Sequence, residues 1–282
     1  MSKPVFVTDS TSYFPDDLRK KYEIRVVPQV LIWGEETLYD GVDIVPTAFY
    51  ERLKSAAVMP TTSQATVGAF QGIFEPLVRE RRQVIAILIS QKLSGTIQSA
   101  ELAKAMLPDA QIEIVNSESC AMAMGFQVLA AARASEAGKA YDEVLAIAKD
   151  AKNHTGVLLV VDTLEFLHRG GRIGGASRLL GTALNLKPIL ELQHGVIEPV
   201  DRVRTRSKAQ ARLLDLLEER INGRPNLRLA VLHAAAEPDA RVLLEAATKR
   251  LNPIETVFSE VSPVVGANVG PGTLGLCYSV DL

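Results

Sequence analysis

The sequence predicts an α/β protein with two domains, each built on a mainly parallel or mixed sheet. Along the whole chain, short apolar runs rich in β-branched residues alternate with helical patterns, which is typical of doubly wound sheets. Residues 84–89 form a near-continuous apolar run, as expected for a strand that is buried on both faces. At 282 residues the chain is also longer than one typical domain, so it can bury two cores.

In the first half of the chain, polar turn residues separate the predicted elements. Strands are predicted at residues 5–10, at 24–33 with an interruption at Pro28, at 84–89 and at 111–115. Helices are predicted to begin near Pro15, at Pro46 (ending at about Lys54), after loop 59–64 and after loop 90–96, and to cover 119–135 and 141–152. This half is expected to form an N-terminal α/β domain, residues 1–154.

The second half repeats the alternation of strands and helices. Strands are predicted at residues 156–161, 186–192, 196–203, 227–233, 254–261 and 274–280, and the second and third form a hairpin around His194-Gly195. Helices are predicted at 163–167, 205–221 and 237–251, and glycine-rich loops at 168–175 and 266–273. This half is expected to form a C-terminal α/β domain, residues 155–282.

Composition argues against several classes of partner. The formal net charge is −2 and the pI about 6.1, which gives no reason to expect nucleic acid or an anionic membrane as the main target. Cys120 and Cys277 have apolar neighbours and no CxxC spacing, as expected for core thiols in a reducing cytoplasm. The four histidines show no metal-ligand spacing. Without a signal-peptide h-region or a stretch long enough to span a bilayer, the protein is expected to be cytoplasmic.

Two hydroxyl-rich loops are candidate sites for an anion. Ser94 lies between the strand at 84–89 and the helix that follows it, and Thr62 and Ser63 precede the helix before that strand. A turn from a strand into a helix brings hydroxyls and backbone N–H groups together beyond the carboxyl end of the strand, where the helix dipole favours negative charge. Ser94 could equally be a helix N-cap that needs no ligand.

Five separated motifs, taken together, resemble the DegV family. They are Thr8-Asp9-Ser10, Thr62-Ser63-Gln64, Leu93-Ser94-Gly95-Thr96, the run LEFLHRGGRI at 164–173 and the run GANVGPG at 266–272. The resemblance extends from residue 4 to the C-terminus, and it implies two α/β domains with a lipid held between them. It also implies that the protein is the fatty-acid-binding subunit of a bacterial fatty-acid kinase.

In that role the protein buries the acyl chain and presents the carboxylate to a separate ATP-using kinase subunit. It then carries the acyl phosphate away. The kinase activity would lie in the partner, so this chain is expected to be a carrier and not an enzyme, with a bound fatty acid as its ligand and without a cofactor. A transient contact with a membrane is compatible with this role.

The resemblance also implies which residues meet the head group of the lipid. The carboxylate contacts fall in the TSQ and LSGT loops, at Thr62, Ser63, Ser94 and Gly95. The family pattern in the last loop is G-A-H-x-G-P-G, so Asn268 stands where the family has histidine. Asparagine can donate a hydrogen bond to a carboxylate but cannot carry a charge or shuttle a proton. Arg172 and Arg204 are expected to lie near the head group and to meet an acyl phosphate or the kinase, since a guanidinium suits a phosphate.

A long acyl chain needs an aliphatic tunnel more than it needs a strong ion pair. Each buried CH₂ contributes about 0.8 kcal/mol, so a long chain offers on the order of 10 kcal/mol before binding costs. Hydrogen bonds to a charged head group contribute roughly 1.5–3 kcal/mol each. The candidate lining residues are Ala121, Met122, Met124, Gly125, Phe126, Leu129, Phe166, Ile173, Leu179, Leu180 and Leu184. Each of them could equally be an ordinary core residue.

Two other functions stay open. A serine-dependent hydrolase of an acyl substrate would use Ser94 or Ser63 as nucleophile, with His233 as base and Asp9 as acid, although the sequence has no G-x-S-x-G elbow. A carrier of another amphipathic carboxylate is the second alternative, which Asn268 suggests. A P-loop nucleotide enzyme is excluded, because the sequence has no G-x-x-x-x-G-K-[ST] motif.

Overall fold

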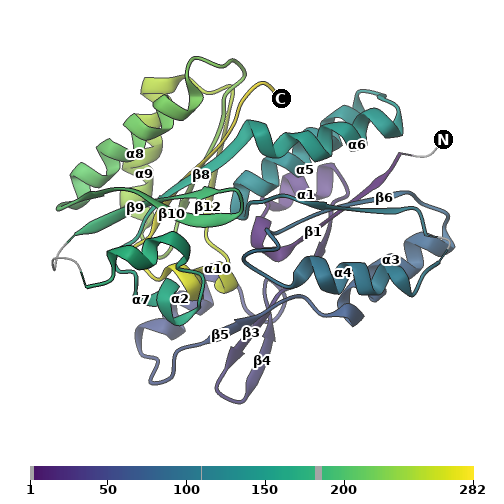
Figure 1. Cartoon of the computed structure of the whole chain (residues 1–282), viewed down its shortest axis with the longest axis horizontal. Helices are drawn as coiled ribbons and strands as arrows, with labels where there is room; N and C mark the ends of the chain where they lie inside the picture. The colour runs from purple at the N-terminus through teal and green to yellow at the C-terminus, as the bar shows by residue number, and fades with distance from the viewer. Residues whose placement is uncertain (1–2, 109, 182–185) are drawn as a thin grey trace.

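The computed structural model describes residues 3–108, 110–181 and 186–282, which form three sheets with helices packed against them (Figure 1). The first sheet has four parallel strands in the order β2 (Arg25–Val27), β1 (Val5–Asp9), β6 (Val84–Leu88) and β7 (Ile112–Asn116). All five residues of β6 are fully buried, because helices cover both faces of the sheet. This confirms the interpretation of its continuous apolar run.

Alternate residues of β1 and β6 face two different hydrophobic cores. Val5 and Val7 pack with Phe70 and Phe74 of α3 (Val67–Arg79) and with α4 (Thr96–Ala105). Phe6 points to the opposite face, toward α5 (Ala121–Glu136). Figure 1 shows α3 and α4 on one side of β1 and β6, with α5 and α6 (Tyr141–Asp150) on the other.

The second sheet has six strands and is mixed. In spatial order they are β10 (Val196–Val203), β9 (Lys187–Gln193), β8 (Thr155–Val160), β13 (Leu274–Ser279), β11 (Arg228–His233) and β12 (Glu255–Glu260). Only the pair β11 and β12 is parallel. The predicted hairpin is confirmed: β9 and β10 meet at His194 and Gly195, both with positive φ, which a tight two-residue turn requires.

The third sheet is small and antiparallel, with the strand order β4 (Glu36–Tyr39), β3 (Val30–Trp33) and β5 (Thr61–Ser63). Two predictions are corrected here. The strand expected at 24–33 is two strands that belong to different sheets. The break lies at Pro28, which has no backbone N–H to donate to a sheet. The loop expected at 59–64 contains β5, which pairs with β3 and thereby fixes the backbone of Thr62.

The remaining helices are divided between the two halves of the chain. Those of the first half are η1 (Ser10–Ser12), α1 (Asp16–Lys21), α2 (Pro46–Lys54) and η2 (Ala151–His154). Those of the second half are α7 (Glu165–Arg169), η3 (Gly174–Leu179), α8 (Arg206–Ile221), α9 (Glu237–Leu251) and α10 (Pro263–Val269). The prediction of a loop at 266–273 is wrong in its first part, because Pro263–Val269 form helix α10. Pro263 occupies the first turn and the Ser262 hydroxyl accepts from the Val265 N–H, an N-terminal signal that the glycines had hidden.

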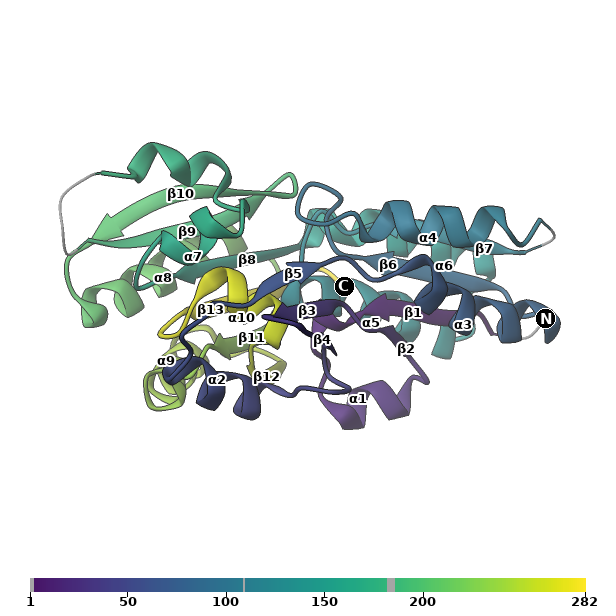
Figure 2. The ribbon, with the colours of Figure 1, turned by 90° about the horizontal axis from the view of Figure 1, so that it is seen from below.

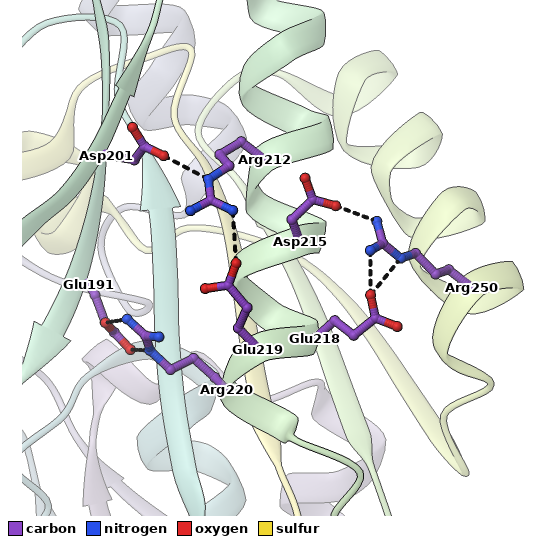
Figure 3. Close-up of polar contacts among 8 residues, drawn as sticks. All are labelled: Glu191, Asp201, Arg212, Asp215, Glu218, Glu219, Arg220 and Arg250. Atoms are coloured by element: carbon purple, nitrogen blue, oxygen red, sulfur yellow. Dashed lines mark hydrogen bonds and ion pairs between the residues drawn. The ribbon is translucent and has the colours of Figure 1, made fainter.

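Helix α8 is joined to its surroundings by three arginine clusters (Figure 3). The one nearest the core joins Arg220 to Glu191, whose carboxylate accepts from Nε and Nη2 at 2.8 Å each and is only 6% exposed. A second cluster joins Arg212 to Asp201 of β10 and to Glu219, and the third joins Arg250 of α9 to Asp215 and Glu218. The two outer clusters are more exposed, so we expect the Glu191 pair to contribute most to stability.

One hydrophobic core runs from the first sheet to the second through α5. Met122 and Phe126 of this helix are buried together with Ile85 of β6 and Cys277 of β13. The strands of the four-stranded sheet lie within residues 5–116 and those of the six-stranded sheet within residues 155–279. The domain boundary at residues 154 and 155 stays a prediction. In the described part of the chain, no helix is both long and apolar enough to cross a bilayer.

Candidate functional site

The largest group of predicted site residues lines one cavity at the junction of the sheets, here called the inner cavity. It has a volume of about 70 Å³. Its apolar wall consists of Ile89, Leu93, Cys120, Leu167, Ile197, Val264, Val265 and Val269, and its polar wall of Thr11, Gln29, Thr62, Ser63, Ser94, Arg172 and Asn268. Figure 2 shows the elements that meet there, with α10 and β5 near the middle of the molecule and α7 beside them.

A second cavity, here called the outer cavity, shares Thr62, Arg172 and Asn268 with the inner one. It has a volume of about 260 Å³, and its other lining residues are Leu53, Met59, Pro60, Thr61, Phe166, Arg169, Gly170 and Ala267. The three shared polar residues therefore lie where the two cavities meet. A head group held by them would have its apolar part on one side and a larger space on the other.

Asn268 is held in one orientation by its own helix. Its Nδ2 donates to the carbonyl oxygen of Val264 at 2.9 Å and to the hydroxyl of Thr62 at 3.3 Å. A carbonyl oxygen can only accept, so the amide nitrogen must face it. Since the Thr62 oxygen accepts this hydrogen bond, its own proton is free to be donated elsewhere. Asn268 thus fixes Thr62 as a donor without placing a charge beside it.

Ser94 is not the N-cap of α4. The N-cap is Gly95, and it makes no side-chain capping bond. The Ser94 hydroxyl lies 2.8 Å from that of Thr96, and Thr96 in turn contacts the buried carboxamide of Gln29. The N-cap role that the sequence allowed for Ser94 is therefore wrong, and its contact with a carboxylate stays a prediction. Gly95 has φ −74° and a Cβ there would lie 3.3 Å from the Gln64 side chain, so its place is set by close packing.

Arg172 is the one charged residue among the described residues that line the inner cavity. Its Nε donates to the carbonyl oxygen of Leu93 at 3.0 Å and its Nη1 to that of Gly170 at 2.5 Å. The first of these bonds connects the loop after α7 with the residue before Ser94. Two of the five guanidinium N–H groups are used in these bonds, and the charge remains available to an anion at the junction of the cavities.

Arg204 lies elsewhere. It lines a separate groove with His168, Lys187 and Arg202, and neither the inner nor the outer cavity includes it. The structure therefore does not bring Arg204 together with Arg172, and its contact with an acyl phosphate or a kinase stays a prediction.

Two buried carboxylates lie behind the polar wall. Asp9 accepts from the Ile89 N–H at 2.8 Å and from the Thr11 hydroxyl at 2.5 Å. Burial raises the pKa of Asp9, and these hydrogen bonds oppose the shift. Burial likewise raises the pKa of Asp40 to about 7, and its Oδ2 accepts from the Ser10 hydroxyl at 2.7 Å. Asp9 fixes the ends of β1 and β6 and directs the Thr11 proton away from the inner cavity.

The geometry that a serine hydrolase needs is not formed around Ser94. His233 packs against Phe258, with ring centroids 5.2 Å apart, and its Nδ1 lies 3.9 Å from Glu260. Burial lowers the pKa of His233. Asp9 is occupied by Ile89 and Thr11, and the hydroxyl partner of Ser94 is Thr96. Nucleophile, base and acid therefore each have other partners.

The described residues that were predicted to line an acyl tunnel do not line the inner cavity, and their contact with an acyl chain stays a prediction. Met122, Met124, Phe126 and Leu129 of α5 are fully buried core residues, and none of the predicted α5 residues lines the inner cavity. Phe166 lines the outer cavity and Leu179 and Leu180 the Arg204 groove, while Leu184 lies outside the described residues. The inner cavity is lined by residues at the ends of strands and by residues of α7 and α10. Gln29 also lines it, and the sequence prediction did not include this residue. Gln29 follows Pro28 and belongs to no sequence motif that would identify it as a site residue.

Two joined sheets with a cavity between them that is lined by both apolar and polar side chains are typical of a protein that binds a small ligand. The chain belongs to the DegV family: a family profile described as "Uncharacterised protein, DegV family" matches residues 5–281. Protein DegV of Bacillus subtilis is 33% identical over 273 residues, which cover 96% of this chain and 97% of that protein. A DegV domain-containing protein of Mycobacterium bovis is 37% identical, with coverage of 98% and 97%.

Solved structures agree with this assignment. A DegV family protein from Thermus thermophilus, described by its fatty-acid binding, has a TM-score of 0.93 and 35% identity, and the match covers 99% of this chain and 100% of that one. The crystal structure of DegV from Bacillus subtilis, described as a fatty acid binding protein, has a TM-score of 0.90 and 32% identity, with full coverage of both chains. The predicted family and fold class are therefore confirmed.

Proposed function

We propose that this protein binds a long-chain fatty acid, with its carboxylate at the polar end of the inner cavity. The observation that carries the proposal is the convergence of two hydroxyls, Thr62 and Ser94, and one guanidinium, Arg172, on a cavity whose other wall is apolar. A carboxylate removed from bulk water needs such donors. The fatty-acid-binding DegV structures support the choice of ligand.

The acyl chain needs more room than the inner cavity offers. Sites for drug-sized ligands usually measure about 300–1,000 Å³, whereas the inner cavity has about 70 Å³. Binding must therefore displace side chains of the adjoining core. Cys120, which lines the cavity, is the N-cap residue of α5, and the buried Met122 and Met124 follow it in the helix. Methionine side chains adapt well to an irregular apolar ligand, so α5 supplies the adaptable part of the wall.

We also propose that the bound carboxylate is presented through the outer cavity to a separate kinase subunit. Thr62, Arg172 and Asn268 face both cavities, so a head group at this point is reachable from the outer side. Arg172 supplies the positive charge that an acyl phosphate would require. This chain acts as the carrier in the cytoplasm, and the phosphoryl transfer takes place in the partner.

Native mass spectrometry of the purified protein, followed by organic extraction, tests the binding proposal. We expect one fatty acid per chain, either after purification or after incubation with hexadecanoate. Thr62→Ala and Ser94→Ala should each reduce ligand retention without unfolding the protein, and Ser55→Ala, an exposed serine at the end of α2, is the matched control. A protein that stays ligand-free with hexadecanoate but takes up a shorter or bulkier carboxylate would replace the proposal with the other-carboxylate carrier.

Addition of a bacterial fatty-acid kinase subunit and ATP to the hexadecanoate-loaded protein tests the presentation step. Acyl phosphate should form only when both proteins are present. Acyl phosphate formed at the same rate from free hexadecanoate would show that this chain does not present the ligand.

A further inference from the structure

The buried pair Gln29 and Thr96 lies directly behind Ser94 at the wall of the inner cavity. Gln29 is 1% exposed and Thr96 is fully buried. Both lie on the first half of the chain, Gln29 between β2 and β3 and Thr96 at the start of α4. Neither belongs to the set of carboxylate contacts proposed above. Their hydrogen bonds nevertheless determine what the Ser94 hydroxyl can do.

The carboxamide of Gln29 has one possible orientation. Its Oε1 accepts from the backbone N–H of Ala65 at 2.9 Å. A backbone N–H can only donate, so the oxygen of the carboxamide must face it. The nitrogen, Nε2, is thereby directed at the Thr96 hydroxyl, 2.8 Å away. Thr96 consequently accepts a hydrogen bond from Gln29.

The Thr96 proton then has two acceptors within reach. The Ser94 oxygen lies at 2.8 Å and Gln29 Oε1 at 3.1 Å. The contact with Ser94 is the shorter of the two, so we assign the Thr96 proton to Ser94. The Ser94 oxygen accepts it, which leaves the Ser94 proton for donation into the cavity. The chain of donors runs from Gln29 through Thr96 to Ser94 and ends at the ligand.

Thr62 is arranged in the same way on the other side of the site. Asn268, oriented by the Val264 carbonyl, donates to the Thr62 oxygen and leaves its proton free. In both cases a carboxamide whose orientation is fixed by the backbone gives a hydroxyl its direction, and no charge is introduced. Both hydroxyls are therefore prepared to donate at once to one acceptor.

We propose that Gln29 and Thr96 are positioning residues that hold the Ser94 hydroxyl as a donor, and that they thereby make the site selective for an ionised carboxylate over a neutral head group such as an alcohol. This inference rests on the proposed function. Hydrogen bonds to a charged acceptor are roughly twice as strong as those between neutral groups, so two aligned donors favour the carboxylate. An alcohol of the same chain length gains the same apolar burial but less from these donors.

The test compares dissociation constants for hexadecanoate and hexadecanol in the full-length protein. Thr96→Val removes the hydroxyl at nearly constant shape, and Thr96→Ser keeps it as the matched control. Gln29→Glu is close in shape, but the ionised carboxylate that it introduces accepts from both Ala65 and Thr96. This reverses the chain of donors and consumes the Ser94 proton. We expect Thr96→Val and Gln29→Glu each to raise the dissociation constant of hexadecanoate at least tenfold and that of hexadecanol less than threefold. Thr96→Ser should bind both ligands with dissociation constants within threefold of the wild type.

Three outcomes would overturn this inference. Equal weakening of acid and alcohol would show that Gln29 and Thr96 only support the wall of the cavity. Unchanged hexadecanoate binding in both Thr96→Val and Gln29→Glu would show that Ser94 does not need them. If wild-type protein binds no hexadecanoate, the proposed function fails and the inference fails with it, whereas wild-type binding with unaffected variants refutes the inference alone. Should Thr96→Val not fold, as judged by circular dichroism, Thr96→Ala, which also removes the hydroxyl without adding a charge, decides the matter by the same acid-to-alcohol comparison.

Discussion

Replacement of Arg172 by alanine tests whether this residue holds the ligand or only its own loop. The sequence resemblance assigns Arg172 to the transfer step, and on that basis alone binding should be unaffected. The structure leads to a different expectation, because Arg172 lines the inner cavity and donates to Leu93, next to Ser94. We therefore expect Arg172→Ala to impair binding as well as transfer.

The magnitude follows from the contacts. A hydrogen bond between a guanidinium and a carboxylate contributes about 1.5–3 kcal/mol, so its loss should weaken hexadecanoate roughly 10- to 150-fold. The bonds from Arg172 to the carbonyls of Leu93 and Gly170 are also lost. Because the site is only partly buried, water can replace them, and we expect the free energy of unfolding to fall by about 1–2 kcal/mol.

The assay is isothermal titration with hexadecanoate, combined with chemical denaturation of each variant. Arg172→Lys keeps the charge without the planar fork and should recover part of the affinity. Arg178→Ala is the control, since Arg178 is exposed, pairs with Glu198 at 3.6 Å and lines neither cavity. A dissociation constant for Arg172→Ala within twofold of the wild type, together with the expected loss of stability, would refute a ligand contact and leave Arg172 as a clamp between loops.

Three further predictions concern packing and titration. A Cβ on Gly170 would lie 2.1 Å from Oδ1 of Asn268, so Gly170→Ala should displace that amide and weaken hexadecanoate binding at least fivefold in the same titration. Asp40 has its pKa raised to about 7 by burial, so the folded state holds this proton more tightly than the unfolded state. The free energy of unfolding should then fall by about 4 kcal/mol in all as pH rises from 3.8 to about 7. The Asp40→Asn variant should lack this loss, so in denaturant titrations at about pH 8 it should be more stable than the wild type. Arg220→Ala leaves the buried Glu191 without its partner and should lower the free energy of unfolding by about 3 kcal/mol.

Matched controls sharpen these three tests. Gly68→Ala adds a methyl group where nothing lies within 4 Å, so equal binding losses in Gly68→Ala and Gly170→Ala would argue against a role for the Asn268 amide. Arg250→Ala removes two exposed ion pairs and should cost less than about 1 kcal/mol. A cost equal to that of Arg220→Ala would contradict the special role of the buried pair. If Asp40→Asn shows the same dependence of stability on pH as the wild type, another titratable group causes that dependence.

Much of the fold could be predicted because hydrophobic periodicity reflects burial directly. The run at residues 84–89 was recognisable as a strand covered on both faces, and β6 is such a strand. Hydrophobic periodicity does not show which strands pair with each other. Pro28 indicates a break in the strand, but no neighbouring residue indicates that the next strand joins a different sheet. Glycines misled the prediction at 266–273, where Ser262 and Pro263 begin a short helix.

The candidate site was predictable where its residues belong to a local motif. Thr62, Ser94 and Asn268 lie in such motifs and line one cavity. Gln29 was missed because its role depends on Ala65 and Thr96, which only the folded chain brings to it. The sequence could not assign the methionines of α5 to a core or to a tunnel, because a buried apolar side chain has the same sequence signature in both.

The position of α5 has a consequence for the kinetics of ligand release. Met122 and Phe126 are buried in a core that includes residues of both large sheets, so the sheets cannot separate without exposing that core to water, at about 25 cal/mol for each Å² of apolar surface. Exchange of a bound lipid must therefore proceed by local opening around the short helices α7 and α10, which flank the cavity. Under the proposed function, slow release by this route would give a long residence time, so a kinase subunit would meet the lipid while it is still bound.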